Sequence, residues 1–209
     1  MPEARVNSHH ARFLLYVSVT LIITFLQQEF VLMPELLNFD LVGEETKARM
    51  LESWQKWRWL SFLIAPIPLI LRLVFVTLCL FIGSFFFSEM SGRKFPDWWG
   101  VAMNVQAIMI LYSIFLCIVN VSAGTDVAFK ITKYTSLLFL EGSNPEQWVK
   151  IPLSAINLVE ISYWIMMTWA IKTQTGRGFG KSFKFVMSSY GTGYLLYIIL
   201  LMFLTLYLR

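Results

Sequence analysis

Long runs of apolar residues constrain this chain more than any other feature of its sequence. A helix that crosses a bilayer needs about 20 mostly apolar residues, and five stretches of the 209-residue chain meet this requirement. Charged residues make up only 14% of the chain, against about 25% in a soluble domain. We therefore predict an all-α integral membrane protein, a polytopic helical bundle forming one domain over residues 1–209, with spans near 13–33, 59–87, 99–121, 151–171 and 185–208.

The positions of Lys and Arg predict which way these spans face. With five spans, the N-terminus and the loops near 88–98 and 172–184 share one side, and each side receives eight basic residues. The first side holds them in shorter segments, which the positive-inside rule weights most. We expect the N-terminus inside and the C-terminus outside. The first run is too long for a signal peptide and no small-residue cleavage motif follows it, so we interpret it as a retained anchor.

The stretch TGRGFGKS at residues 175–182 resembles a phosphate-binding loop but lacks its spacing. That motif requires G-x-x-x-x-G-K-[ST] between a strand and a helix, whereas Thr175 stands where the first glycine should be and an apolar run precedes it. We expect no nucleotide binding. The stretch instead predicts a cytosolic turn whose glycines end the helices and whose basic residues favour an anionic inner leaflet: Lys172, Arg177, Lys181 and Lys184.

Residues 44–58 predict a helix outside the membrane. Met50, Trp54 and Trp57 recur at helical spacing, and charges fill the other positions. This pattern is typical of an amphipathic helix on the membrane surface. A helical extension of the second span into water is an equally good interpretation. Residues 122–150 contain a second apolar piece, TSLLFL at 135–140, which is too short to span and predicts a surface or re-entrant element.

Two charges fall inside the predicted spans. Arg72 lies about a dozen residues into the second span, and Glu160 lies about nine residues into the fourth. A charge at that depth costs at least about 2.5–3.5 kcal/mol on insertion scales unless it finds a partner. The two spans run in the same direction, so we hypothesise that Arg72 and Glu160 pair or share a polar cavity. A structural ion pair, a substrate or proton pathway, and no contact at all remain open.

Other polar residues and prolines lie in or beside the spans. Glu29 lies near the outer end of the first span, where we expect solvation at the headgroup level. Asn104, Gln106 and Asn157 predict hydrogen bonds between helices, each worth about 0.6 kcal/mol. Pro66 and Pro68 predict a kink in the second span, because proline frees carbonyl groups and bends a helix.

Residues that commonly carry catalysis in membranes are sparse in this sequence. His9 and His10 are the only histidines, and adjacent residues do not share a helix face. We therefore expect no metal site and place both in a disordered polar tail. Cys79 and Cys117 lie in apolar runs, where a thiol behaves as a small hydrophobe. With Asp40, Asp97 and Asp126 outside the spans, we expect no cofactor, no catalytic residues and no enzymatic activity.

Five apolar spans over roughly residues 13–208, with the N-terminus inside and the C-terminus outside, resemble the Yip family of membrane-trafficking proteins in topology and size. No DLYGP-type signature of that family is present, so no functional residue is transferred. The resemblance implies binding of partners.

The sequence thus predicts a non-enzymatic scaffold, assembly factor or accessory subunit in the bacterial inner membrane. The expected partners are lipids and other membrane proteins or further copies of the chain, and not nucleic acids. A small transporter or channel subunit that uses Arg72 and Glu160, and a lipid-active enzyme, are the alternatives.

Overall fold

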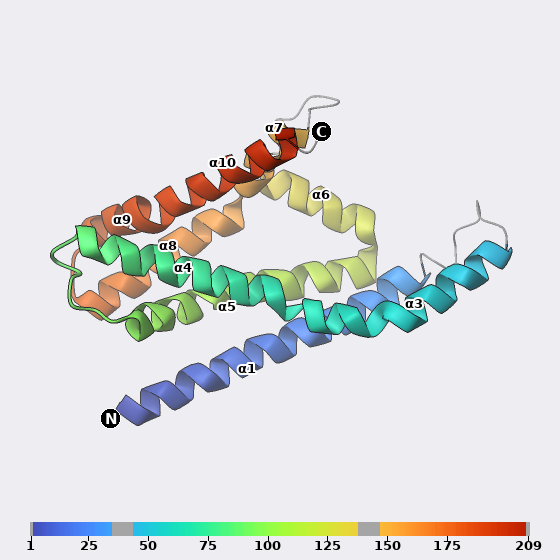
Figure 1. Ribbon diagram of the computed structural model, residues 1–209, viewed down its shortest axis with the longest axis horizontal. Helices are drawn as coiled ribbons and strands as arrows, with labels where there is room; N and C mark the ends of the chain where they lie inside the picture. Colours follow the sequence, from blue (N-terminus) through green and yellow to red (C-terminus); the bar gives the residue numbers. More distant parts are fainter. Residues whose placement is uncertain (1, 35–43, 138–146, 208–209) are drawn as a thin grey trace. The chain divides into compact units, whose positions relative to one another are not determined.

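A computed structural model of the chain describes residues 2–34, 44–137 and 147–207 (Figure 1). These residues form helices, with one isolated bridge between Ser136 and Asn157 and no strand in the described ranges. The predicted all-helical fold is confirmed for this part of the chain. The helical elements are α1 (Pro2–Gln27), the π-helical turn η1 (Gln28–Leu32), α3 (Glu44–Ile64), α4 (Pro66–Phe86), α5 (Phe95–Ala123), α6 (Thr125–Thr135), α7 (Gln147–Ala155), α8 (Leu158–Thr175), α9 (Phe179–Val186), the π-helical turn η3 (Met187–Gly191) and α10 (Thr192–Tyr207).

Four helical segments in the described ranges are long and apolar enough to cross a membrane: Ser8–Leu32, Glu45–Phe86, Phe95–Ala123 and Phe179–Tyr207. They correspond to the first, second, third and fifth predicted spans. Because so much of the chain is apolar and helical, these segments indicate a membrane-embedded protein. α1 begins at Pro2, so His9 and His10 lie in a helix and the expected disordered tail is wrong at these positions.

The predicted fourth span, 151–171, is not one continuous helix, and this corrects the expectation from the sequence. α7 ends at Ala155 and α8 begins at Leu158. Between them Asn157 is extended, with φ −133° and ψ 161°, and its side chain caps the next helix. Asn competes with helical backbone by forming such local hydrogen bonds, which explains why an apolar run breaks here.

The segment at 44–58 is helical, as expected, and belongs to α3, which continues to Ile64. Only Ala65 separates α3 from α4, and its N–H still donates to the carbonyl of Ser61 (2.8 Å). The break therefore falls directly before Pro66, which occupies the first position of α4, where a helix tolerates proline. In the region 122–150, residues 125–135 form α6, while residues 138–140 of the TSLLFL piece lie outside the described residues.

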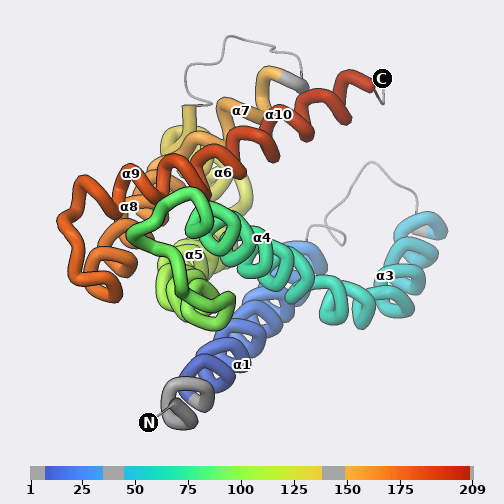
Figure 2. Tube along the Cα trace, turned by 60° about the vertical axis from the view of Figure 1, so that its left-hand side comes forward, coloured from blue at the N-terminus to red at the C-terminus, as the bar shows by residue number. Residues whose placement is uncertain are grey.

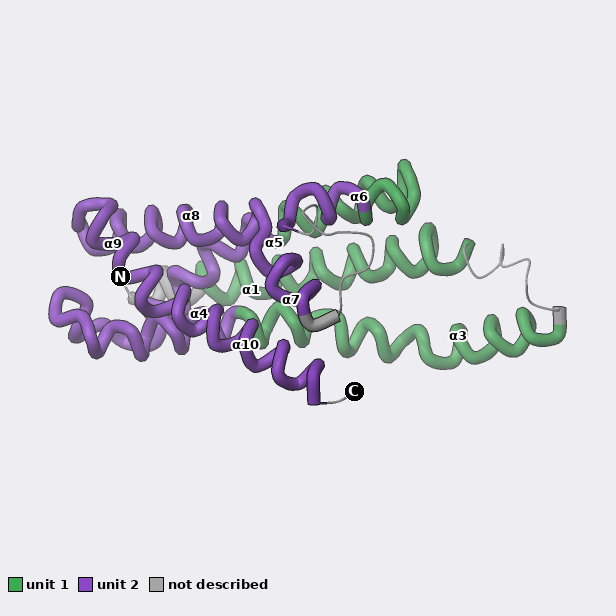
Figure 3. Tube along the Cα trace, turned by 90° about the horizontal axis from the view of Figure 1, so that it is seen from above, with its two compact units in different colours: residues 1–72, 110–129 green, residues 73–109, 130–209 purple. Residues whose placement is uncertain are grey.

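The chain divides into two compact units, coloured in Figure 3, and α4 and α5 each contribute to both. Unit 1 consists of residues 1–72 and 110–129. In unit 1 the η1 end of α1 is tied to α3, because Arg58 donates to Glu29 (3.0 Å) and Gln28 donates to the carbonyl of Arg58 (3.4 Å). Gln28 is buried at this contact.

Unit 2 consists of residues 73–109 and 130–209 and contains the larger described core. Trp98 of α5 stacks on Phe185 of α9 with ring centroids 5.2 Å apart, and both side chains are fully buried. α4 packs closely on the last part of the chain, where Gly83 lies against Ser189 and Gly193 lies against Cys79. The other face of α10 is apolar and exposed, as expected for contact with lipid.

Candidate functional site

Glu160 is the most deeply buried acidic side chain among the described residues, with 3% of its surface exposed. It lies in the first turn of α8, just after the break between α7 and α8. An ionisable group buried in a membrane protein is costly, so it marks a candidate functional site.

Two aromatic side chains donate hydrogen bonds to the carboxylate of Glu160. The hydroxyl of Tyr190 lies 2.7 Å from Oε1, and the indole Nε1 of Trp164 lies 2.9 Å from the same oxygen. An indole N–H can only donate a hydrogen bond. Oε1 of Glu160 therefore accepts two hydrogen bonds, one from Trp164 and one from Tyr190. Hydrogen bonds to a charged acceptor are stronger than those between neutral groups. The arrangement therefore fixes the Glu160 side chain inside unit 2.

The break between α7 and α8 positions Glu160 at the start of its helix. The backbone N–H of Glu160 donates to Oδ1 of Asn157 (2.8 Å), which caps α8. On the other side of the break, the carbonyl of Ala155 accepts from the hydroxyl of Tyr194 (3.0 Å), and the carbonyl of Ile156 accepts from the N–H of Leu137 (3.1 Å). Buried backbone groups released by a broken helix need such partners.

A π-helical turn carries the tyrosine that contacts Glu160. Tyr190 belongs to η3, and Tyr194 follows one turn later in α10. The rings of Trp164, Tyr190 and Tyr194 pack together with centroid separations of 5.8–6.1 Å. Single π-helical turns inside α-helices occur frequently at functional sites. We call Asn157, Glu160, Trp164, Tyr190 and Tyr194 the Glu160 cluster.

The other polar residues singled out in the sequence lie on η1, α4 and α5. Arg72 is on α4 in unit 1 whereas Glu160 is in unit 2, and their pairing stays a prediction. Glu29 forms an ion pair with Arg58 on α3. On α5, Asn104 is exposed, while Gln106 is buried and its Oε1 accepts no hydrogen bond within the described part of the chain.

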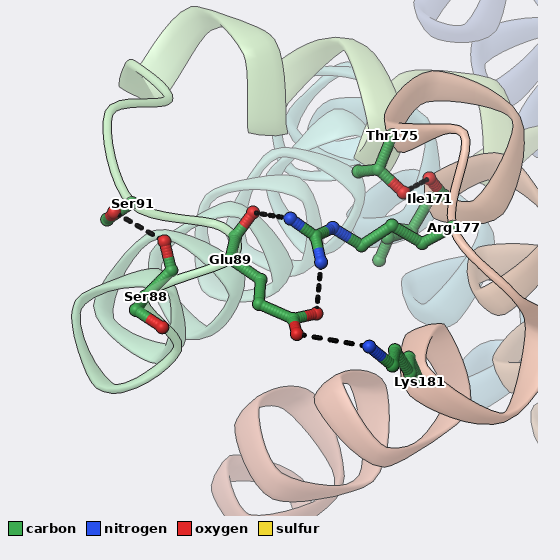
Figure 4. A network of polar contacts seen from close by, with 7 residues as sticks. All are labelled: Ser88, Glu89, Ser91, Ile171, Thr175, Arg177 and Lys181. Atoms are coloured by element: carbon green, nitrogen blue, oxygen red, sulfur yellow. Dashed lines mark hydrogen bonds and ion pairs between the residues drawn. The ribbon is translucent and has the colours of Figure 1, made fainter.

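A second polar network joins the turn between α8 and α9 to the segment between α4 and α5 (Figure 4). Arg177 forms an ion pair with Glu89 and also donates to its backbone carbonyl (3.1 Å), while Nζ of Lys181 lies 3.2 Å from Oε1 of Glu89. Arg93 reaches the same turn and donates to the carbonyl of Gln174 (2.9 Å). These contacts bring the loops near 88–98 and 172–184 together, and their placement on one side of the membrane stays a prediction.

The glycines of this turn end one helix and precede the next, in the orange part of the trace in Figure 2. Gly176 has φ +68°, a left-handed conformation that favours glycine, and its N–H donates to the carbonyl of Lys172. Gly178 directly precedes α9, which carries Lys181 and Lys184. The turn is therefore shorter than the predicted loop, because α9 begins at Phe179.

The hydrogen bond from Lys181 lowers the pKa of the Glu89 carboxyl, with the positive charges of Arg177 and Lys181 acting in the same direction. A carboxyl group with a lowered pKa stabilises the fold at neutral pH. That contribution is lost as the pH falls below the ordinary value of about 4.3 and through the lowered pKa. Glu89 was not singled out in the sequence, because it lies between two spans without a recognisable motif.

The fold and the Glu160 cluster define the class of protein: an all-helical, membrane-embedded chain with a buried carboxylate held by aromatic donors. In the part that the structure describes, no group of three or more His, Cys, Asp or Glu residues could hold a metal ion. No protein-family model, curated protein or solved structure matches the chain.

Proposed function

We propose that this chain is a non-enzymatic, multi-pass protein of the bacterial inner membrane that acts as a scaffold, assembly factor or accessory subunit. It would bind other membrane proteins, as the resemblance to the Yip family also suggests. In this proposal α8, whose 18 residues give a length of about 27 Å, is the remaining crossing segment. The N-terminus is inside and the C-terminus is outside.

The observation that carries the proposal is the exposed aromatic surface of α3. Trp57 and Trp59 are 54% and 53% exposed, and Met50 is exposed on the same helix. α4 alone has 21 residues, or about 31 Å, which already matches the hydrocarbon thickness of about 30 Å. α3 is therefore available for contacts outside the hydrocarbon core.

The charges of α3 favour a protein partner over burial in lipid. Seven of the fifteen residues from 44 to 58 are charged, and such a segment does not enter hydrocarbon. The ion pair between Arg58 and Glu29 holds α3 to α1 without covering Trp57. Exposed apolar surface next to charged residues marks interaction sites, and tryptophan is enriched among the residues that dominate binding energy.

Site-specific crosslinking in cells tests this proposal. A benzophenone amino acid placed at Trp57 or Trp59 is expected to give one discrete protein adduct, identified by mass spectrometry. The double variant Trp57→Ala with Trp59→Ala is expected to lose the same partner on purification while retaining its yield. Phe203, which is exposed on α10, is the matched control position and is expected to give lipid adducts only.

The crosslinking experiment has two outcomes that would contradict the proposal. Lipid adducts alone at Trp57 and Trp59 would identify α3 as a membrane-surface anchor. Adducts with a second copy of the chain would instead favour the alternative function.

That alternative is a small transporter or channel subunit, and the burial of Glu160 favours it specifically. Discontinuous helices in transporters bind ions or substrates at their breaks, and Glu160 lies beside the break between α7 and α8. Arg72, at similar depth in its predicted span, is the proposed partner of Glu160.

A charge swap tests this pairing. Arg72→Glu and Glu160→Arg are each expected to reduce the yield of folded protein severely, because each leaves two like charges in the membrane. The double variant is expected to recover part of that yield, measured by size-exclusion chromatography of the detergent extract. A double variant no better than the single ones would exclude a direct pair.

A further inference from the structure

The segments before α5 and around the turn between α8 and α9 carry an excess of positive charge. The segments 87–97 and 172–184 contain six basic residues, Arg93, Lys94, Lys172, Arg177, Lys181 and Lys184, and two acidic ones, Glu89 and Asp97. Their difference of four equals the formal net charge of the whole chain, +4. Contacts of Glu89 and Arg93 with the α8–α9 turn bring the two segments together. A cationic surface of this kind attracts anionic headgroups.

The two acidic side chains of this surface are engaged in different ways. Asp97 accepts from the backbone N–H of Lys94 (3.0 Å), at the start of α5. Glu89 contacts two cationic side chains, because its Oε2 pairs with Arg177 and its Oε1 lies 3.2 Å from Nζ of Lys181. Figure 4 shows the Glu89 carboxylate directed at both. Glu89 therefore occupies the position in which an external anion would meet Arg177 and Lys181.

The exposed face of α9 combines apolar rings with ammonium groups. Phe179 and Phe183, 42% and 40% exposed, stack on each other with centroids 6.3 Å apart. Lys181 and Lys184 are exposed beside them, while the opposite face of α9 is buried through Phe185 and Val186. Interfacial helices show this composition, with aromatic rings at the acyl boundary and Lys at the phosphate level.

We propose that α9 and the Glu89 network form a binding site for an anionic phospholipid, in which Glu89 competes internally with the lipid phosphate. Lys181, Arg177 and Lys184 bind the phosphate, and Phe179 and Phe183 contact the glycerol and acyl region. With Glu89 ionised, Arg177 and Lys181 are paired within the protein and the site is weak. Loss of the Glu89 charge releases both cations and strengthens lipid binding. This lipid site uses none of the residues of α3 that are proposed to bind a protein partner.

A titration with defined lipids tests the site. The purified full chain, in neutral detergent micelles, is titrated with phosphatidylglycerol or phosphatidylcholine, and bound lipid is measured by native mass spectrometry. Glu89→Gln is expected to bind phosphatidylglycerol about fivefold more tightly, the change that one basic group near an anionic surface produces. Lys184→Gln is expected to weaken binding by a similar factor. Phosphatidylcholine binding is expected to stay unchanged in both.

Controls separate a lipid site from general effects of charge and folding. Lys130→Gln changes an exposed lysine on α6 and is expected to leave phosphatidylglycerol binding unchanged. Unchanged or weaker phosphatidylglycerol binding by folded Glu89→Gln would overturn the proposal. If Glu89→Gln does not fold, unaltered binding by Lys184→Gln would overturn it instead. Inorganic phosphate that displaces the lipid at equal concentration would show a free-phosphate site, and would overturn the assignment to a phospholipid.

Discussion

Replacing Glu160 by alanine is expected to lower the free energy of unfolding by about 1–4 kcal/mol. The substitution leaves two donors, the hydroxyl of Tyr190 and the indole N–H of Trp164, without the carboxylate that accepts from both. Each unsatisfied buried group costs about 1–3 kcal/mol in water-soluble proteins. Hydrogen bonds between membrane helices average only about 0.6 kcal/mol. Thermal unfolding in detergent measures the loss.

Two further substitutions separate hydrogen bonding from charge at this site. Glu160→Gln keeps an acceptor oxygen and is expected to be less damaging than Glu160→Ala, while Tyr190→Phe removes one donor and is expected to cost about 0.6–1.7 kcal/mol. Ser162→Ala, on the exposed side of α8, is the matched control and should have almost no effect. A Glu160→Ala protein as stable as the parent would contradict the structural importance of the cluster.

Gly83→Ala is expected to destabilise the protein by up to about 2 kcal/mol, because the usual cost of overpacking a core, about 1–3 kcal/mol, is only partly offset by the better helix propensity of alanine. A Cβ atom on Gly83 would lie 2.3 Å from Cβ of Ser189 and 3.3 Å from its Cα. The backbone of α4 would therefore have to move away from η3. The cost of this movement exceeds the gain of about 1 kcal/mol that alanine normally brings to a helix. The midpoint of thermal unfolding measures the balance.

A compensating substitution at Ser189 tests whether the close contact between Gly83 and Ser189 causes the loss of stability. Adding Ser189→Gly to Gly83→Ala removes the Cβ that would clash, and the double variant is expected to recover most of the lost stability. Gly180→Ala places the same methyl group on α9, where the described residues put no atom within 4 Å of the new Cβ apart from the neighbouring backbone of the same helix, and is expected to be neutral or stabilising. If Gly83→Ala and Gly180→Ala behaved alike, close packing of α4 on η3 would be excluded.

The length of the apolar runs made the helical fold predictable. Within the run 151–171, however, local hydrogen bonds of Asn157 divide the expected single helix into α7 and α8. Hydropathy over 151–171 contains no sign of a break. The signal is the spacing of Asn157 and Glu160, an N-cap residue followed three positions later by Glu, as in a capping box. That pattern was available in the sequence and indicates the start of α8, whereas the burial of Glu160 is seen only in the structure.

One of the two aromatic hydrogen-bond donors to Glu160 could be predicted from the sequence. Trp164 lies four residues after Glu160, so a helix places the two on the same face. Tyr190 was not predictable, because it belongs to a distant segment and reaches Glu160 from a π-helical turn that no residue pattern indicates. For the same reason Glu89 could not be matched with Arg177 and Lys181, which follow it by 88 and 92 positions.

That separation along the chain has a consequence for biosynthesis. At about 5–20 residues per second, the ribosome needs roughly 4–18 s to advance from Glu89 to Arg177, a distance of 88 residues. During this interval α4 and α5 have been synthesised, but the acidic residue in their connection lacks both cationic partners. Long-range contacts of this kind form late, because a large loop must close first. The ion pairs of Glu89 with Arg177 and Lys181 can therefore form only after the turn between α8 and α9 has been synthesised, later than α4 and α5.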